Sequence, residues 1–211
     1  MVFIKLATWP LLVAALGVGN VMAIEEAEYT VVLKEQSFEL RSYESHILAE
    51  TIVEGDFEDA GNQAFSRLFK YISGNNKSRE NVKMTSPVAQ SSANEKIAMT
   101  SPVGQQREAG RWAVSFMMPA SYTLVTTPEP KDPSVKLRMV AARHIASVEY
   151  TGFWSEKAYQ KNRAKLEIWV NQKELTVIGE AIWARYNPPF MPWFLRRNEI
   201  LVPVASPREG R

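Results

Sequence analysis

The chain has 211 residues, of which 45% are hydrophobic and 23% are charged, and its 25 Lys and Arg residues nearly balance 23 Asp and Glu residues. This composition is ordinary for a single folded domain with a substantial core, and the near-neutral charge gives no indication of a nucleic-acid partner. The chain contains no cysteine, which excludes disulfides, thiolate nucleophiles, Cys-ligated clusters and heme attached covalently through a Cys-x-x-Cys-His motif.

Residues 1–23 have the pattern of an export signal. Lys5 gives a positive start, residues 6–18 are almost entirely apolar, and Val21-Met22-Ala23 is typical of a small-residue cleavage site. We therefore predict a cleaved signal peptide and an exported protein, either periplasmic or secreted. The alternative is a retained membrane anchor, because the apolar run approaches the length that spans a bilayer. In that case the protein would contact a membrane through this segment.

The first part of the mature chain predicts strands followed by one helix. Strand patterns occur in "YTVVL", "SFELRSY" and "HILAETIVEG", and the last two are joined around Glu44-Ser45 in the manner of a tight hairpin. Asp56 can cap the helix that follows, which ends at Ser73-Gly74-Asn75. Its apolar residues recur at spacings of three and four. They are Phe57, Ala60, Ala64, Leu68 and Ile72.

The sequence Met-Thr-Ser-Pro-Val occurs twice, starting at Met84 and at Met99, and the polar "SSANEK" between the copies is typical of a turn. Strand alternation puts the Met, Ser and Val of each copy on one face. Proline cannot donate a hydrogen bond to a neighbouring strand, so Pro87 and Pro102 each predict a place where pairing ends and a cleft can open. The two methionines either fill core space or contact a ligand such as heme, whose iron a thioether can ligate.

The second part of the chain predicts a similar series of elements, and we expect one domain from residue 24 to residue 204. The tail from residue 205 to residue 211 is expected to be disordered. The elements are strand "RWAVSFMM", a proline-rich connector, strands "VKLRMV" and "HIASVEYTG" as a hairpin, a helix at about 155–172, and last strands "EAIWARY" and "NEILVPV".

An internal repeat supports this organisation. We therefore predict an α+β domain of two β-β-α-β-β halves, in which an antiparallel sheet closes on itself and two helices pack outside. A shift of 97 positions places Leu40-Arg41 on Leu137-Arg138, Ala49 on Ala146 and Gly55 on Gly152, with each glycine just before a helix.

The sequence contains two histidines, His46 and His144. The shift of 97 positions puts them one residue out of register on equivalent strands, which disfavours a two-histidine metal site. A lone histidine on a strand is more often a surface or hydrogen-bonded residue, and His46 is kept as the candidate iron ligand. No Gly-x-Ser-x-Gly, phosphate-loop, His-Glu-x-x-His or EF-hand motif occurs, so no catalytic residue is predicted from these motifs.

The segment "YNPPFMPWFLRRNEILVPV" starts at Tyr186 and has a twin arginine, Arg196 and Arg197. Between Tyr186 and this pair lie three prolines and three large aromatic residues, which are Pro188, Pro189, Pro192, Phe190, Trp193 and Phe194. The prolines stiffen a loop, the aromatic rings could wall an apolar ligand, and Arg196 and Arg197 could pair with carboxylates. The alternative is a loop packed over the open end of the sheet, with one of these arginines paired to Glu199.

These motifs resemble those of the SOUL heme-binding protein family. The resemblance extends from about residue 29 to residue 204 and is carried by "FELRSY", "ILAETIVEG", "IAMTSPV", "FMMPASY" and above all by the segment from Tyr186. It implies a distorted antiparallel barrel of two β-β-α-β-β halves, noncovalent binding of heme or another tetrapyrrole, and no enzyme activity. The family is also similar in fold to bacterial effector-binding domains that hold small apolar molecules.

The resemblance places the tetrapyrrole in an apolar cleft between the first helix and the loop before the last strand. Phe65 and Phe69, one helical turn apart, could form one wall of this cleft. Some relatives carry a histidine at the position of Ser42, so axial ligation from that position is lost. The candidate ligand-binding residues are Phe65, Phe69, Met84, Met99, Met191, Trp193, Arg196 and Arg197.

Three hypotheses for function follow. The first is an exported, non-enzymatic protein that binds heme noncovalently for transport, storage or sensing. The second is a carrier or sensor of another small apolar molecule, such as a lipid. The third is a hydrolase that uses a carboxylate and a tyrosine in the cleft, although the sequence contains no motif for one.

Overall fold

The computed structural model describes residues 24–79 and 94–206. The first Met-Thr-Ser-Pro-Val copy, which includes Met84, lies outside the described residues, as does the N-terminal segment. The elements are β1 (Glu25–Glu26), β2 (Tyr29–Glu35), β3 (Phe38–Tyr43), β4 (His46–Val53), α1 (Phe57–Ile72), β5 (Asn76–Lys77), β6 (Thr100–Ser101), β7 (Val103–Glu108), β8 (Arg111–Met117), β9 (Glu129–Pro130), β10 (Val135–Val140), β11 (Arg143–Thr151), α2 (Glu156–Gln172), β12 (Ile182–Arg185), a 3-10 turn η1 (Trp193–Leu195) and β13 (Arg197–Val204).

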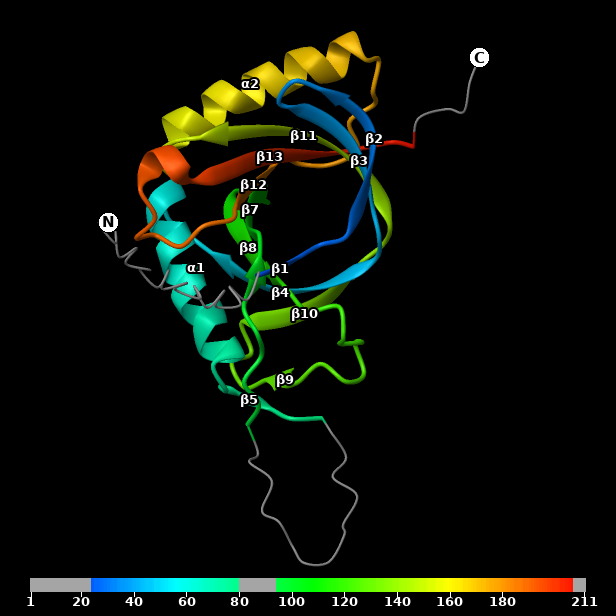
Figure 1. Ribbon diagram of the computed structural model, residues 1–211. Coiled ribbons are helices and arrows are strands. Elements are labelled where there is room, and N and C mark those ends of the chain that lie inside the picture. Colours follow the sequence, from blue (N-terminus) through cyan, green and yellow to red (C-terminus); the bar gives the residue numbers. More distant parts are fainter. Residues whose placement is uncertain (1–23, 80–93, 207–211) are drawn as a thin grey trace, which may run out of the picture.

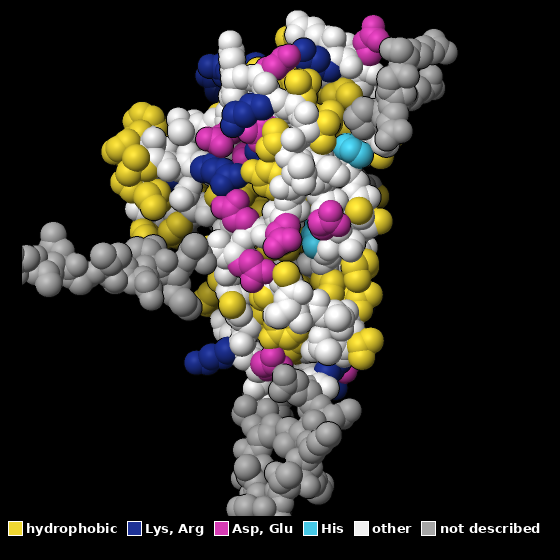
Figure 2. Space-filling view, turned by 45° about the vertical axis from the view of Figure 1, so that its right-hand side comes forward, with side chains coloured by type: hydrophobic (Ala, Val, Ile, Leu, Met, Phe, Trp, Pro, Cys, Tyr) yellow, Lys and Arg dark blue, Asp and Glu magenta, His cyan; other side chains and the backbone are white. Residues whose placement is uncertain are grey.

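Nine strands form one curled antiparallel sheet in the order β10-β4-β8-β7-β12-β13-β11-β3-β2. The sheet is a half-barrel, and both helices pack outside it, α1 against β4 and β8 and α2 against β11 and β13 (Figure 1). On the face shown in Figure 2, acidic and basic side chains are interspersed, in agreement with the balance of charge in the sequence. Within the described ranges, no helix is long and apolar enough to cross a membrane.

The structure confirms the two β-β-α-β-β halves and adds how they interlock. β3-β4-α1-β7-β8 is followed by β10-β11-α2-β12-β13, and the residues matched by the 97-position shift pair reciprocally across the halves. Leu40 lies opposite Ala146, and Leu137 lies opposite Ala49. Each half therefore contributes a strand to the other half's end of the sheet.

The two predicted hairpins are wrong. β3 pairs with β2 and β11, whereas β4 pairs with β8 and β10. The short link at Glu44-Ser45 instead carries the chain from one end of the curled sheet to the other. The strand "RWAVSFMM" also belongs to the first half, as β8, and not to the second. Alternation of apolar residues indicates which face of a strand is buried but not which strand is its neighbour.

Helix α1 forms where the sequence predicts it. The Asp56 carboxylate accepts hydrogen bonds from the backbone N–H groups of Glu58 and Asp59 at 3.1 and 2.9 Å, and the helix ends at Ile72. Gly55 has φ +120° and Gly152, before α2, has φ +137°. Such angles are costly for residues with a Cβ atom, which accounts for a glycine at both repeat positions.

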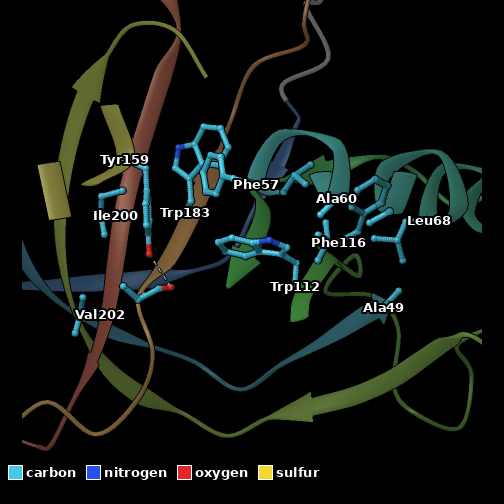
Figure 3. Packing of buried hydrophobic residues seen from close by; sticks show 14 of the residues in the cluster. Ala49, Phe57, Ala60, Leu68, Trp112, Phe116, Tyr159, Trp183, Ile200 and Val202 are labelled. Atoms are coloured by element: carbon cyan, nitrogen blue, oxygen red, sulfur yellow. Dashed lines mark hydrogen bonds between the residues drawn. The ribbon is translucent and has the colours of Figure 1, made fainter. Parts of the chain in front are cut away.

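Aromatic rings fill the core between the helices and the sheet (Figure 3). Phe57 of α1 stacks on Trp183 at a centroid distance of 4.6 Å and meets the edge of Trp112 at 5.2 Å. The hydroxyl of Tyr159 from α2 donates to the carbonyl of Ala181 at 3.4 Å. Rings from both halves thus meet in one continuous core.

A buried carboxylate joins the two halves on the other face of the sheet. Glu199 of β13 is 0% exposed, and Arg41 of β3 donates to both of its oxygens at 2.7 and 3.0 Å. Arg197 and the hydroxyl of Tyr186 also donate to it, at 2.9 and 2.8 Å. Burial alone would raise the pKa of Glu199, but the hydrogen bonds and charges of Arg41 and Arg197 hold its pKa below the ordinary value. Glu199 therefore stays ionised and ties β3 to β13.

We expect Glu199→Gln to destabilise the fold by about 3–5 kcal/mol, because it leaves the Arg41 guanidinium buried without its main counterion. The measurement is the free energy of unfolding in urea. Glu167→Gln is the matched control, since Glu167 is exposed and pairs with Arg163 within one helix, and it should cost less than about 1 kcal/mol. Equal losses in the two variants would contradict the structural role of Glu199.

The same carboxylate predicts a pH dependence. Because the pKa of Glu199 is lower in the folded chain than its ordinary value of 4.5, its contribution to stability is fully present above that value. It is lost as the pH falls through the lowered folded pKa. The fall in unfolding free energy below about pH 4.5 should be shallower in Glu199→Gln than in the wild type. Parallel pH profiles would show that other carboxylates cause the acid sensitivity.

Candidate ligand-binding site

A cavity of about 300 Å³ lies between helix α1, the second Met-Thr-Ser-Pro-Val copy and the segment that follows β12. Its volume is near the lower end of the range found for small-molecule sites, which is about 300–1,000 Å³. This is where the resemblance places the ligand cleft. Most of the described side chains around it come from three walls, which differ in chemistry.

The helix wall is aromatic. Phe65 and Phe69 stack with centroids 6.0 Å apart and an interplanar angle of 9°, and Phe65 meets the edge of Phe116 of β8 at 5.3 Å. Residues four apart lie on the same helix face, which explains the stacking. Phe65 is partly buried, whereas Phe69 is 48% exposed. The pair forms an apolar wall whose inner ring is fixed by the core and whose outer ring is open to solvent.

The second wall is the Met-Thr-Ser-Pro-Val strand. Met99, Ser101 and Val103 all line the cavity, as strand alternation predicts. Pro102 lies between β6 and β7 and interrupts strand pairing at the cavity, which confirms the prediction for this copy. The Ser101 hydroxyl donates to the carbonyl of Tyr186 at 3.3 Å. This bond ties the strand to the third wall.

The third wall is the segment that starts at Tyr186, held in place by Arg196. The Arg196 guanidinium donates to the carbonyls of Met191 and Pro189 at 2.7 and 2.6 Å, and its cationic carbon lies 4.6 Å from the Trp154 ring centroid. Pro188 and Pro189 line the cavity. Arg196 thus shapes the cavity wall through the backbone.

Arg197 is engaged as well. Its side chain donates to Glu199 and to both carboxylate oxygens of Glu26, the latter at 3.1 Å, and it lies 3.6 Å from Glu149. The structure therefore has the pairing with Glu199 that the sequence offered as the alternative to a ligand contact. A role for Arg196 or Arg197 in binding propionates stays a prediction.

Met191 and Trp193 lie outside the lining of the cavity. The Trp193 ring stacks on Phe153 with centroids 5.1 Å apart and is 49% exposed. Of the predicted ligand-binding residues, the structure brings Phe65, Phe69 and Met99 together around one cavity. Contacts of Met191 and Trp193 with a ligand remain untested.

His46 lies away from this cavity. It borders two other hollows of the molecule, and its Nδ1 atom is 2.9 Å from the carbonyl oxygen of Glu44. Burial lowers the pKa of His46. The described part of the chain holds no group of three or more His, Asp or Glu side chains that could bind a metal ion.

The sequence reasoning missed Arg185 and Trp154, which both line the cavity. The Arg185 guanidinium carbon lies 4.8 Å from the Trp183 ring centroid and 5.4 Å from that of Trp154. Burial lowers the pKa of Arg185 to about 10. Alternation along the strand "EAIWARY" could have revealed it, because it places Arg185 on the same face as the core residue Trp183.

Comparison with known proteins identifies the family and agrees with the fold. The SOUL heme-binding protein family matches residues 24–203. The chain belongs to this family. Heme-binding protein 1 of Xenopus tropicalis is 27% identical to this SOUL chain over 78% of its length and 82% of the relative's. Heme-binding protein 1 of Mus musculus is 25% identical over 79% and 84%.

Solved structures show the same SOUL-type fold at low sequence identity. The C-terminal domain of EcmrR superposes with a TM-score of 0.53 at 10% identity, over 85% of this chain and 99% of that one. A hydrolase from Listeria innocua superposes with a TM-score of 0.51 at 12% identity, over 82% and 94%. Identities this low establish the shared effector-binding-domain-like architecture alone.

We expect Arg196→Met to loosen the third wall without unfolding the protein, because it removes two hydrogen bonds to loop carbonyls. Amide hydrogen exchange at Met191 and Leu195, whose N–H groups bond within the loop, should accelerate by about tenfold or more, given about 1.5 kcal/mol for a charged hydrogen bond. Arg107→Met is the control, since Arg107 lies over Trp112 at 3.9 Å, away from the loop. Unchanged exchange in Arg196→Met would show that the prolines alone hold the wall.

Proposed function

We propose that this protein binds heme or a related tetrapyrrole noncovalently in the cavity beside α1. The observation that carries the proposal is that three groups line one cavity. They are the stacked rings of Phe65 and Phe69, the Met99 side chain, and Pro188 and Pro189 of the third wall. Flat, apolar walls with a few polar groups suit a planar macrocycle. Membership of the SOUL heme-binding protein family supports the same ligand.

The lining chemistry fits a ligand held by burial more than by coordination. Among the described residues around the cavity, Met99 offers a thioether and none is a histidine. Heme, when bound, would supply the metal centre, and Met99 is the candidate to contact it. Because the cavity volume is small and Phe69 is half exposed, we propose that the macrocycle is enclosed only in part.

A hydrolase is not the function we propose. The structure does contain a carboxylate beside a tyrosine, since the Tyr186 hydroxyl donates to Glu199 at 2.8 Å. However, Glu199 is fully buried and its oxygens are occupied by Arg41 and Arg197. Its pKa is held below the ordinary value, which is unsuited to a general acid near neutral pH.

For the place where the protein acts, we propose that it is exported from the cytoplasm. The pattern of residues 1–23 supports this proposal.

Titration of the purified protein with hemin should produce a shifted Soret band that saturates at one equivalent. Phe69→Ala should weaken binding by about three- to tenfold, since an aromatic contact contributes about 0.5–1.5 kcal/mol. Ile168→Ala is the control, because Ile168 is 60% exposed on α2 and lies outside the cavity lining; it should leave the affinity unchanged.

Met99→Leu separates contact with the metal from packing. Leucine keeps the apolar volume but has no sulfur, so a thioether ligand predicts a changed Soret position with nearly unchanged stability. An identical spectrum would assign Met99 to packing. Absence of any Soret change at micromolar wild-type protein would overturn the proposal of heme binding itself.

A further inference from the structure

The cavity is lined by a partly buried cation without a carboxylate counterion. Arg185 lies at the end of β12, and its Nε atom is buried with no hydrogen-bond partner. Its Nη2 atom is 3.4 Å from Gln105 Oε1, a long contact with a neutral acceptor. Among the described residues, no carboxylate forms an ion pair with Arg185 or shifts its pKa.

The surrounding residues leave space for this guanidinium. A Cβ atom added to Gly61 of α1 would lie 3.3 Å from both terminal nitrogens of Arg185, so a larger residue there would push the side chain aside. The rings of Trp154 and Trp183 lie beside the guanidinium and offset part of the cost of burying it. The buried indole N–H of Trp154 has no acceptor either. The Nε–H group of Arg185 and the indole N–H group of Trp154 therefore both lie beside the cavity without an acceptor.

Two other arginines with buried or partly buried guanidinium groups are paired with carboxylates. Arg41 is paired with Glu39 and Glu199, and Arg197 with Glu26 and Glu199. These pairings follow the rule that a buried charge is compensated, since an unpaired one is strongly destabilising. Arg185 departs from that rule at a position that lines the cavity, whereas Arg143, whose Nε atom is also buried without a partner, lies outside the lining of this cavity. The counterion of Arg185 is expected to arrive with the ligand.

We propose that Arg185 is the recognition site for a carboxylate on the ligand, so that the cavity takes apolar molecules that carry at least one acidic group. Guanidinium groups bind carboxylates through two parallel hydrogen bonds, a geometry that fixes orientation as well as charge. A propionate of a tetrapyrrole has this chemistry, and so does the head of a fatty acid. For a tetrapyrrole ligand, the inference rests on the function proposed above. It assigns the contact with a propionate to Arg185, whereas the sequence suggested Arg196 and Arg197.

The test compares protoporphyrin IX with its dimethyl ester, which keeps the macrocycle but has no free carboxylate and no metal. Binding is followed by fluorescence titration of the full chain. The wild type should prefer the free acid by about tenfold to a hundredfold, the range expected for hydrogen bonds to a charged group. Arg185→Met should reduce that preference to within about twofold by weakening the acid and not the ester.

Three further variants and measurements exclude a purely structural role. Arg185→Lys keeps the positive charge but cannot donate two parallel hydrogen bonds to one carboxylate. It should therefore retain part of the preference for the free acid. Arg107→Met removes a guanidinium group that lies over Trp112, outside the lining of the cavity. This variant should keep the whole preference for the free acid. Thermal unfolding of Arg185→Met should show equal or higher stability, because a desolvated, uncompensated charge is removed. A structural arginine would instead lower the melting temperature when it is replaced.

The outcomes separate the two proposals. Equal wild-type affinities for the acid and the ester, or a preference that survives in Arg185→Met, would overturn the carboxylate site while leaving tetrapyrrole binding intact. If neither porphyrin binds but palmitate does, in a manner that requires Arg185, the carboxylate site stands and the tetrapyrrole proposal fails. Absence of binding by all three ligands would overturn both.

Discussion

The buried ion pair between Arg41 and Glu199 is the interaction on which the geometry of the site depends. It joins β3 of the first half to β13 of the second, and it fixes more than the sheet. Tyr186 donates its hydroxyl to Glu199 and accepts the Ser101 hydroxyl at its carbonyl. The carboxylate is thus connected through one residue to the proline-interrupted strand that lines the cavity. Loss of its charge would disturb the site as well as the fold.

The arginines near the cavity divide into those that build it and one that is left unpaired. Arg196 donates hydrogen bonds to two carbonyls of the loop, and Arg197 forms ion pairs with Glu26 and Glu199. Both guanidinium groups are therefore already bound within the protein. Arg185 has aromatic neighbours and no acid. A charge left uncompensated in the wall of a cavity lowers the stability of the fold, which is common at binding sites.

Local signals in the sequence predicted local structure well. Asp56 and the apolar spacing gave the limits of α1, and alternation placed Met99, Ser101 and Val103 on one face. The predictions were wrong or incomplete where the pairing of a strand or of a charged side chain depends on a residue far away in the sequence. The short link after β3 was predicted to form a hairpin, but β3 pairs with β11, about a hundred residues away. Likewise, the twin arginine stood out in the sequence, but nothing there shows that Arg197 already has its counterions. The free cation could be identified only once all the carboxylates near it were located.

The two halves share a topology but differ in the side chains that their helices present beside the cavity. Helix α1 buries Ala60, Gly61 and Ala64 between the larger Phe57 and Leu68, whereas α2 buries Tyr159, Leu166 and Trp169. Of these small residues, Gly61 lies against the Arg185 guanidinium, and a Cβ atom there would be 3.3 Å from both of its terminal nitrogens. The same helix lines the cavity with Phe65 and Phe69. The absence of a side chain at one helix position therefore lets the cation approach α1 next to the aromatic wall, in an interior that is otherwise closely packed.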